Sequence, residues 1–270
     1  MIEQYAYIEA EMARKLLARA KTMQPSKRGI DCHAYLIGDY AVLATFRIKL
    51  RNVATRDDDL AYFNELIATL MRLHARGVAV VPILGYCYDP ESENGAGYII
   101  QPRAKGEELY DDAVMQPFYV RKSPYLSSSA DPKAYILSRT HFVSQIPQDH
   151  FDKFISDVIT LLDHDILIDF MGKSNFFYDK TAGFQFIDLD SHSDYKYGLA
   201  EHQCDSREVA AYNAFVPCHQ QLDKRALKKL SKPELQQLTR DNQIIFEKCR
   251  AAMLCNGVAE EMLRGVAEFS

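Results

Sequence analysis

The second half of the chain carries three polar side chains whose types suit metal-dependent chemistry. Asp169 follows a short apolar stretch at residues 166–168, and Asn175 and Asp188 lie at the two ends of a predicted hairpin. Carboxylate and carboxamide oxygens are ligands that suit Mg²⁺, which usually also binds phosphate oxygens and water. A free aspartate beside such an ion can orient or deprotonate a hydroxyl group. If the hairpin folds back to bring them together, these residues provide the groups that phosphoryl transfer needs.

The elements around these residues are predicted from the spacing of apolar side chains. Residues 147–164 show the apolar stripe of a helix. Residues 175–178 and 184–187 are apolar runs on either side of a turn at 180–183, which predicts a short hairpin. Turn chemistry is the alternative explanation for each polar residue alone, because Asp and Asn hydrogen-bond their own backbone. The helix, the strands and the three residues taken together favour a functional site.

Charged residues of interest in the first half stand on one predicted strand and one predicted helix. In the strand at residues 40–50, the period of two places Arg47 and Lys49 on the same face. A solvated strand lysine is the alternative for Lys49. The helix at residues 57–76 carries Glu65 roughly opposite its main apolar stripe. An exposed helix charge is the alternative for Glu65.

The order of elements predicts an α+β fold in two lobes. A β-rich first part with one embedded helix precedes a mostly helical second part, and the break between them is a natural place for a cleft. The predicted domains are an N-lobe at residues 1–101, a hinge at 102–106 and a helical C-lobe at 107–270. The other expected elements are a helix at 3–23, a strand at 33–37, a hairpin from 78–86 and 97–101, a helix beginning at 107, a loop-rich stretch at 111–146 that contains one helix or strand, and helices from about 206 onward.

The pattern of Asp169, Asn175 and a Phe-Ile-Asp strand end at Asp188 resembles the protein-kinase-like superfamily. Kinases of the aminoglycoside- and choline-kinase type, which act on small molecules, belong to this group. The resemblance covers roughly residues 29–195. It implies that Asp169 is the catalytic base, that Asn175 is a metal ligand and that Asp188 is the main Mg²⁺ ligand. Asp190 would assist the metal or cap the next turn.

The resemblance extends to the first half and implies ATP as the second ligand. The strand bearing Lys49 is similar to the one that supplies the family's phosphate-binding lysine, with Arg47 as the competing residue. Glu65 is similar to the helix glutamate that pairs with that lysine. Residues 101–104 would be the hinge that contacts adenine through its backbone, which makes Gln101 and Arg103 nucleotide-binding candidates.

The sequence departs from the family pattern at several points. The glycine-rich loop that covers the phosphates is missing, Asp188-Leu189-Asp190 replaces Asp-Phe-Gly, and no Ala-Pro-Glu follows. The short activation segment favours a small-molecule acceptor over a protein. The expected function is therefore an ATP- and Mg²⁺-dependent phosphotransferase acting on a hydroxyl group. The alternatives are a catalytically inactive pseudokinase, which binds a nucleotide or a partner, and a nucleotidyltransferase.

Composition limits the remaining classes of function. The chain has 270 residues, of which 47% are hydrophobic and 26% are charged, as in ordinary globular proteins. Its net charge of -5 argues against a general nucleic-acid binder. No apolar run is long enough for a membrane span, and the first residues do not resemble a secretory signal. Six cysteines without a C-x-x-C motif are typical of reduced thiols. These features predict a cytoplasmic protein, and they fix neither the acceptor nor the oligomeric state.

Overall fold

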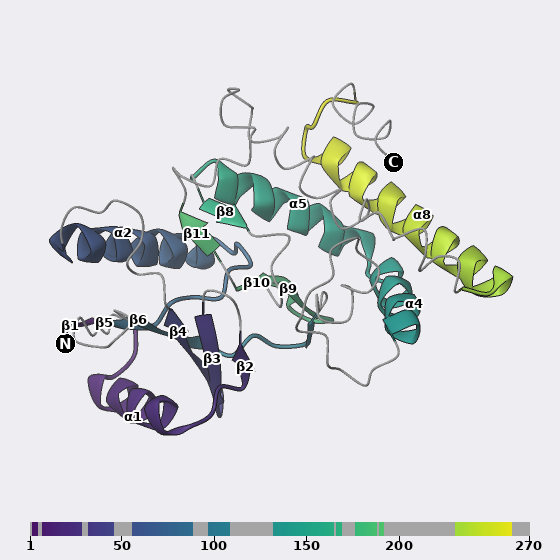
Figure 1. Cartoon of the computed structure of the whole chain (residues 1–270). Coiled ribbons are helices and arrows are strands. Elements are labelled where there is room, and N and C mark those ends of the chain that lie inside the picture. Colours follow the sequence, from purple (N-terminus) through teal and green to yellow (C-terminus); the bar gives the residue numbers. More distant parts are fainter. Residues whose placement is uncertain are drawn as a thin grey trace. The chain divides into compact units, whose positions relative to one another are not determined.

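The chain divides into two compact units, Met1–Lys105 and Gly106–Ser270 (Figure 1). Each unit has its own sheet and its own helices, so the protein is a mixed α and β structure, as the sequence predicts. The identification of these units with the two lobes of a kinase-like fold stays a prediction. The computed structural model describes residues 2–4, 7–28, 32–45, 56–88, 97–108, 132–164, 166–168, 176–187, 189–191 and 230–260.

A six-stranded antiparallel sheet organises the first unit. Its strand order is β1-β5-β6-β4-β3-β2, so the central strands β6 and β4 are paired in space although they are far apart in the sequence. The hairpin of β3 and β4 turns through Gly38 and Asp39, and Gly38 has a φ of 59°. Two-residue hairpin turns need such a positive φ, which glycine adopts without strain. The strands are β1 (Ile2–Gln4), β2 (Lys27–Arg28), β3 (Cys32–Ile37), β4 (Tyr40–Thr45), β5 (Gly85–Tyr88) and β6 (Gly97–Pro102).

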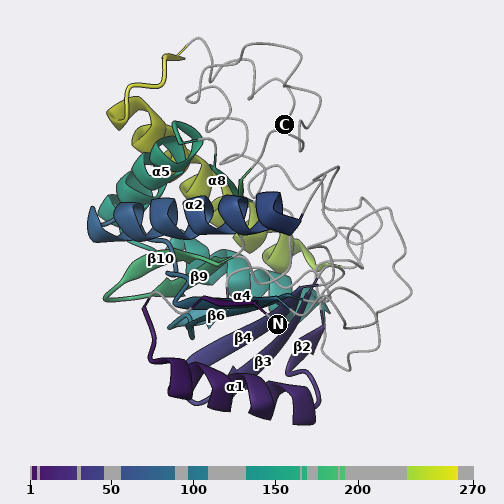
Figure 2. The same cartoon turned by 90° about the vertical axis from the view of Figure 1, so that its left-hand side faces the viewer.

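Helix α1 (Ala10–Thr22) runs along one face of this sheet (Figure 2). Four of its apolar residues recur at helical spacing and are buried, whereas the other residues of the helix are exposed. They meet Val42 and Ile100, which are direct partners on neighbouring strands and therefore share a face. The buried core formed in this way contains Ala13, Leu16, Leu17, Ala20, Val42, Cys87 and Ile100.

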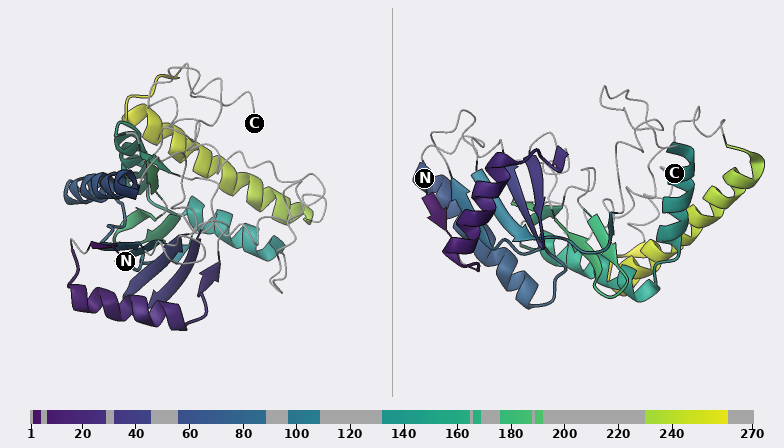
Figure 3. Two further views of the ribbon diagram at one scale, coloured as in Figure 1. Left: turned by 60° about the vertical axis from the view of Figure 1, so that its left-hand side comes forward. Right: turned by 90° about the horizontal axis from the view of Figure 1, so that it is seen from below.

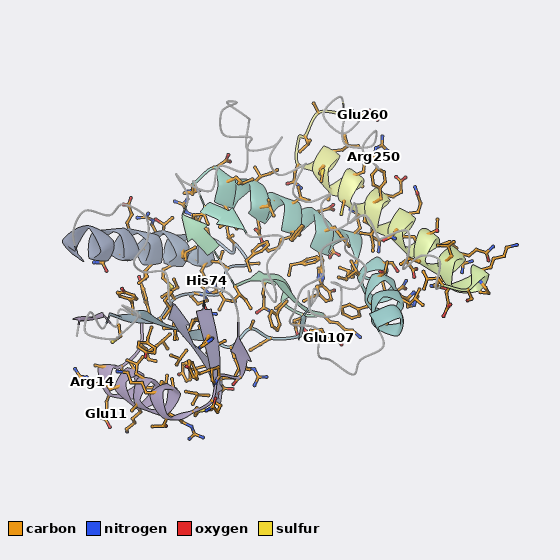
Figure 4. All side chains as sticks on the ribbon, viewed as in Figure 1. Glu11, Arg14, His74, Glu107, Arg250 and Glu260 are labelled. Carbon is orange, nitrogen blue, oxygen red and sulfur yellow. The ribbon has the colours of Figure 1, made fainter. Side chains whose placement is uncertain are left out.

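Helix α2 (Arg56–Ala75) lies on the side of the sheet opposite α1 (Figures 1 and 2). Its buried side chains include Ile67, Leu70 and Leu73, which follow one another at helical spacing. Gly77, with a φ of 87°, follows the helix as a C-terminal glycine typically does. Figure 4 shows His74 near this end of the helix, where its Nδ1 lies 3.1 Å from the carbonyl oxygen of Val80.

Three helices dominate the described part of the second unit: α4 (Pro132–Ser144), α5 (Gln148–Leu162) and α8 (Lys232–Cys255). Helix α8 lies beside both α4 and α5 (Figure 3). It begins with a capping box in which the carboxylate of Glu234 accepts a hydrogen bond from the Ser231 amide at 2.7 Å. Beyond its C-terminal end, Glu260 forms an ion pair with Arg250 (Figure 4).

Two small antiparallel sheets complete the second unit. One has the order β10-β9-β7 and the other pairs β11 with β8. The β9–β10 hairpin agrees with the hairpin predicted at residues 175–178 and 184–187. The strands of the two sheets are β7 (Glu107–Glu108), β8 (Ile166–Ile168), β9 (Phe176–Asp179), β10 (Gly183–Phe186) and β11 (Leu189–Ser191).

Three predictions of local structure were wrong. The helix predicted at residues 3–23 begins only at Ala10, because Ile2–Gln4 pairs with β5 as a strand. The strand predicted at residues 78–86 begins only at Gly85. Pro82 lies in the part that is not a strand, and proline has no amide hydrogen to donate to a neighbouring strand. The helix predicted to begin at residue 107 is instead the short strand β7, which pairs with β9.

None of the helices that the structure describes is both long and apolar enough to cross a membrane.

Candidate functional site

Two strand pairs frame the segments that carry the candidate metal ligands. Ile168, the last residue of β8, is paired with Leu189, the first residue of β11. Phe176, the first residue of β9, is paired with Phe186, the last residue of β10. Only two residues connect β10 to β11 in the sequence, so these four strand ends belong to one small region of the unit.

The candidates Asp169, Asn175 and Asp188 lie outside the described residues. Asp190 belongs to β11, where its Cα partner is Leu167 of β8. Within the described part of the chain, no group of three or more His, Cys, Asp or Glu residues is arranged to hold a metal ion. The predicted metal site therefore rests on the segments that follow β8, precede β9 and precede β11, and its residue roles stay predictions.

The β9–β10 hairpin is fixed locally by its turn. The Asp179 carboxylate accepts hydrogen bonds from the amides of Thr181 and Ala182, each at 2.8 Å. Asp side chains stabilise turns in this way by satisfying backbone donors. Gly183, the first residue of β10, has a φ of 76°, and a positive φ is typical of the end of a three-residue hairpin loop. The turn therefore fixes the register of the strands that begin and end near the candidate ligands.

An aromatic cluster packs this hairpin against α5. The ring centroid of Phe184 lies 4.7 Å from that of Phe154 and 5.6 Å from that of Phe151. Phe186 lies 5.6 Å from Phe154 and is fully buried. Such tilted and edge-on pairs add to the gain from burying apolar area. The strand β10 is thus held on a helix, which provides a rigid support for the site.

Tyr178 of β9 is buried at the centre of these contacts, with only 4% of its surface exposed. Its ring lies 5.3 Å from Phe184 and 5.8 Å from Phe142 of α4, between ring centroids. Its hydroxyl lies 2.8 Å from Nδ1 of His150 on α5. Burial, and then the negative charges of Asp149 and Asp179, raise the pKa of Tyr178 above its usual value. The hydroxyl therefore stays protonated and available for hydrogen bonding at neutral pH.

The backbone of Tyr178 is also in close contact with the start of β7. Gly106 has a φ of 87°, and a Cβ atom there would come within 2.1 Å of the Tyr178 carbonyl oxygen. The next residue, Glu107, is the Cα partner of Tyr178 in the β7–β9 pair (Figure 4 labels Glu107). Only glycine fits at position 106, because any side chain would overlap the backbone of β9.

The candidate residues of the first unit occupy different environments. Gln101 lies in β6 opposite Ala41 and is 3% exposed. Arg103 is exposed, and its backbone amide donates a 2.8 Å hydrogen bond to the carbonyl of Asp39 in the β3–β4 turn. Glu65 is exposed on α2. Lys49 and its competitor Arg47 lie outside the described residues, so the predicted pairing of Lys49 with Glu65 stays a prediction.

Sequence patterns do not indicate three residues that the structure brings together: Gly106, His150 and Tyr178. Their separations in the chain follow no motif, since the hydrogen bond between His150 and Tyr178 spans 28 residues. The one available signal is the alternation in the predicted strand, which places Tyr178 on the same face as Phe176.

No protein family model matches this chain, and no curated protein matches it. Among solved structures, a co-crystal structure of WbdD with a kinase inhibitor matches with a TM-score of 0.36 and 11% identity, covering 84% of this chain. A structure of the bifunctional kinase-methyltransferase WbdD matches with a TM-score of 0.29 and 9% identity, covering 93% of this chain. The chain spans 46% of the length of each of these two proteins. At these TM-scores the likeness assigns neither a fold family nor a residue role to this chain.

Proposed function

We propose that this protein is an ATP- and Mg²⁺-dependent phosphotransferase that moves the γ-phosphoryl group to a hydroxyl, with a small molecule favoured over a protein as acceptor. The chemistry of the donor set supports this proposal. Asp169, Asn175 and Asp188 supply two carboxylates and one carboxamide, which are oxygen ligands of the kind that Mg²⁺ binds. Such a site works mainly by positioning the reactants and neutralising charge.

The strand pairing is the observation that carries the proposal. Asp169 follows Ile168 and Asp188 precedes Leu189 in the sequence, and Ile168 and Leu189 are direct partners. Paired Cα atoms are about 4.5–5.5 Å apart and consecutive ones about 3.8 Å, so chain geometry limits the Cα separation of the two aspartates to about 13 Å. A metal ion that bridges the carboxylates to a triphosphate is compatible with this limit.

The pairing of β9 with β10 supports including the amide of Asn175 in the proposed donor set. Asn175 precedes Phe176, and Phe176 is paired with Phe186, two residues before Asp188. In the proposed arrangement Asp188 and Asn175 hold Mg²⁺, with Asp190 assisting, and Asp169 orients the acceptor hydroxyl as general base. Lys49 would bind the phosphates with support from Glu65, and the backbone around Gln101 and Arg103 would contact adenine.

Turnover measurements test this proposal. Mg²⁺-dependent ATP binding, ATP hydrolysis and the released product are measured for the wild type and for Asp169→Ala and Asp188→Ala. We expect ADP as product, loss of turnover in both variants, and weaker Mg²⁺·ATP binding in Asp188→Ala alone. Turnover that survives Asp188→Ala would remove the metal assignment.

The same experiment separates the alternatives. The glycine-rich loop expected over the phosphates is absent from the sequence, which favours a pseudokinase as the second candidate. ATP binding without turnover in the wild type would support that candidate. Release of pyrophosphate in place of ADP would indicate nucleotidyl transfer.

A further inference from the structure

Tyr178 is placed where it can control the position of the strand that follows the candidate ligand Asn175. It lies in β9, three residues after Asn175, and both its side chain and its backbone are held from outside the strand. The hydroxyl bonds to His150 on α5, and the carbonyl lies against Gly106 at the start of β7. A strand held at one residue from two directions has little freedom to slide or twist.

From this arrangement we propose that Tyr178 is a positioning residue for the metal site, acting through its hydrogen bond to His150. This inference rests on the proposed function, because it takes Asn175 as a ligand of Mg²⁺. The side chain of Tyr178 does not itself bind metal, nucleotide or acceptor. It fixes β9 on α5, which would restrict the strand that directly follows the proposed ligand Asn175 before Mg²⁺ binds.

The surroundings of the pair show why this hydrogen bond matters. The rings of Phe142 and Phe184 contact the ring of Tyr178, and the residue as a whole is buried. Without His150 the hydroxyl of this buried residue would lose its described partner, which is costly. Without the hydroxyl, β9 keeps its aromatic packing but loses its directional link to α5. Tyr178→Phe therefore removes the link and preserves the packing.

The test compares Tyr178→Phe with a matched control in the same unit. Ser144 is buried on α4, and its hydroxyl lies 2.7 Å from the carbonyl oxygen of His141 and 3.2 Å from the Asp241 carboxylate, so Ser144→Ala removes a buried hydrogen-bonding group outside β9. The full chain is titrated with Mg²⁺ at fixed ATP. For Tyr178→Phe we expect the Mg²⁺ midpoint to rise about three- to tenfold, as the loss of one hydrogen bond predicts. For Ser144→Ala we expect a lower unfolding midpoint and an unchanged Mg²⁺ midpoint.

A double-mutant cycle with His150→Ala identifies the interaction responsible. Once His150 is removed, Tyr178→Phe should raise the Mg²⁺ midpoint by less than twofold further, because the two side chains act through one bond. Independent, additive effects would overturn the proposal. An unchanged Mg²⁺ midpoint in Tyr178→Phe, with reduced stability like that of Ser144→Ala, would also overturn it.

Hydrogen exchange keeps this inference separate from the proposed function. Without any ligand, the amides in the β7–β9 pair should exchange about three- to tenfold faster in Tyr178→Phe than in the wild type, and should be unchanged in Ser144→Ala. If the wild type binds no Mg²⁺·ATP, the proposed function fails, and the exchange result alone decides whether Tyr178 positions β9. Equal exchange in Tyr178→Phe and the wild type would show that it does not.

Discussion

Two glycines with the same backbone conformation differ in what surrounds them. Gly77 and Gly106 both have a φ of 87°, but a Cβ atom would meet nothing within 4 Å at Gly77 and the Tyr178 carbonyl at Gly106. Gly106→Ala should therefore lower the free energy of unfolding by about 2–5 kcal/mol, through backbone strain and overlap together. Gly77→Ala should cost about 1 kcal/mol, through strain alone. Urea unfolding of both variants measures the difference, and equal losses would contradict the close approach of β7 to β9.

The raised pKa of Tyr178 predicts a loss of stability in alkali. Above its usual pKa of 10.0, the unfolded chain releases the phenolic proton while the folded chain still holds it. The folded state then binds more protons, so the free energy of unfolding falls as the pH rises. The contribution of protonated Tyr178 to the free energy of unfolding is fully present below about pH 10 and is lost as the pH rises through the pKa of Tyr178 in the folded state.

Tyr178→Phe removes the phenolic group and should reduce the fall in the free energy of unfolding as the pH rises. Urea unfolding at about pH 9 and about pH 11 would measure the change in both proteins. Tyr35→Phe, a half-buried tyrosine of β3 in the other unit, is the control. A fall of the same size in Tyr178→Phe and the wild type would mean that burial does not hold the proton on Tyr178.

At the scale of elements, α1 contributes to the first unit through its packing on the sheet. Leu17 is 5% exposed and belongs to the core that α1 forms with β4, β5 and β6. Leu17→Ala should lower the free energy of unfolding by about 2–5 kcal/mol, because it removes buried methyl groups and leaves a cavity. Met12 stands on the same helix with 43% exposure, so Met12→Ala should change stability by less than about 0.5 kcal/mol. Similar losses measured by urea unfolding would contradict this packing of α1.

Lys248 of α8 forms hydrogen bonds with the backbone that connects α4 to α5. The Lys248 ammonium donates to the carbonyls of Ser144 and Ile146 at 2.7 and 2.5 Å, where α4 ends. A cation at the C-terminal end of a helix also interacts favourably with the helix dipole. Burial lowers the pKa of Lys248, so desolvation offsets part of this gain.

Lys248→Met keeps the apolar stem and removes the ammonium. It should lower the free energy of unfolding by about 1–3 kcal/mol, because the two carbonyls lose a charged donor. The matched control is Lys232→Met in the exposed first turn of α8, where a change below about 0.5 kcal/mol is expected. Chemical denaturation that finds no difference between the two variants would show that the connection between α4 and α5 does not depend on Lys248.

The elements that the sequence predicted well are those with a complete local signal. Apolar spacing predicted α5 to within a few residues, and turn chemistry predicted the β9–β10 hairpin. The strands β1 and β7 escaped prediction because their pairing partners lie far along the chain, in β5 and β9. Three residues or fewer cannot show a period, so only the tertiary partner decides that such segments are strands.

In the candidate site, too, some residues are predicted from the sequence and others are found only in the structure. Residue types and the predicted helix and strands around them together predict Asp169, Asn175 and Asp188 as oxygen ligands, and these roles stay predictions. The contact of His150 with Tyr178 depends on how the hairpin packs on α5, and no pattern in the sequence records it. A contact of this kind is defined by the packing of the fold, so the sequence alone gives no signal for it.

At the scale of the whole molecule, charge restricts how a triphosphate can bind. The chain carries a net charge of -5, so its long-range field does not attract an anionic nucleotide. In the proposed function, binding would come from a local arrangement in which Mg²⁺ would neutralise charge on the phosphates and on the two carboxylates. The proposed function therefore requires that nucleotide affinity depends strongly on Mg²⁺.

This requirement predicts how ligands change the stability of the full chain. At about 100 times its dissociation constant, Mg²⁺·ATP should raise the free energy of unfolding by about 2.7 kcal/mol, because it binds the folded state alone. ATP with a chelator should give a much smaller increase. Asp188→Ala should lose most of the gain, whereas Asp163→Ala, at an exposed aspartate after α5, should keep it. Thermal and urea unfolding with and without Mg²⁺ measure these shifts, and an equal gain from metal-free ATP would contradict the metal site.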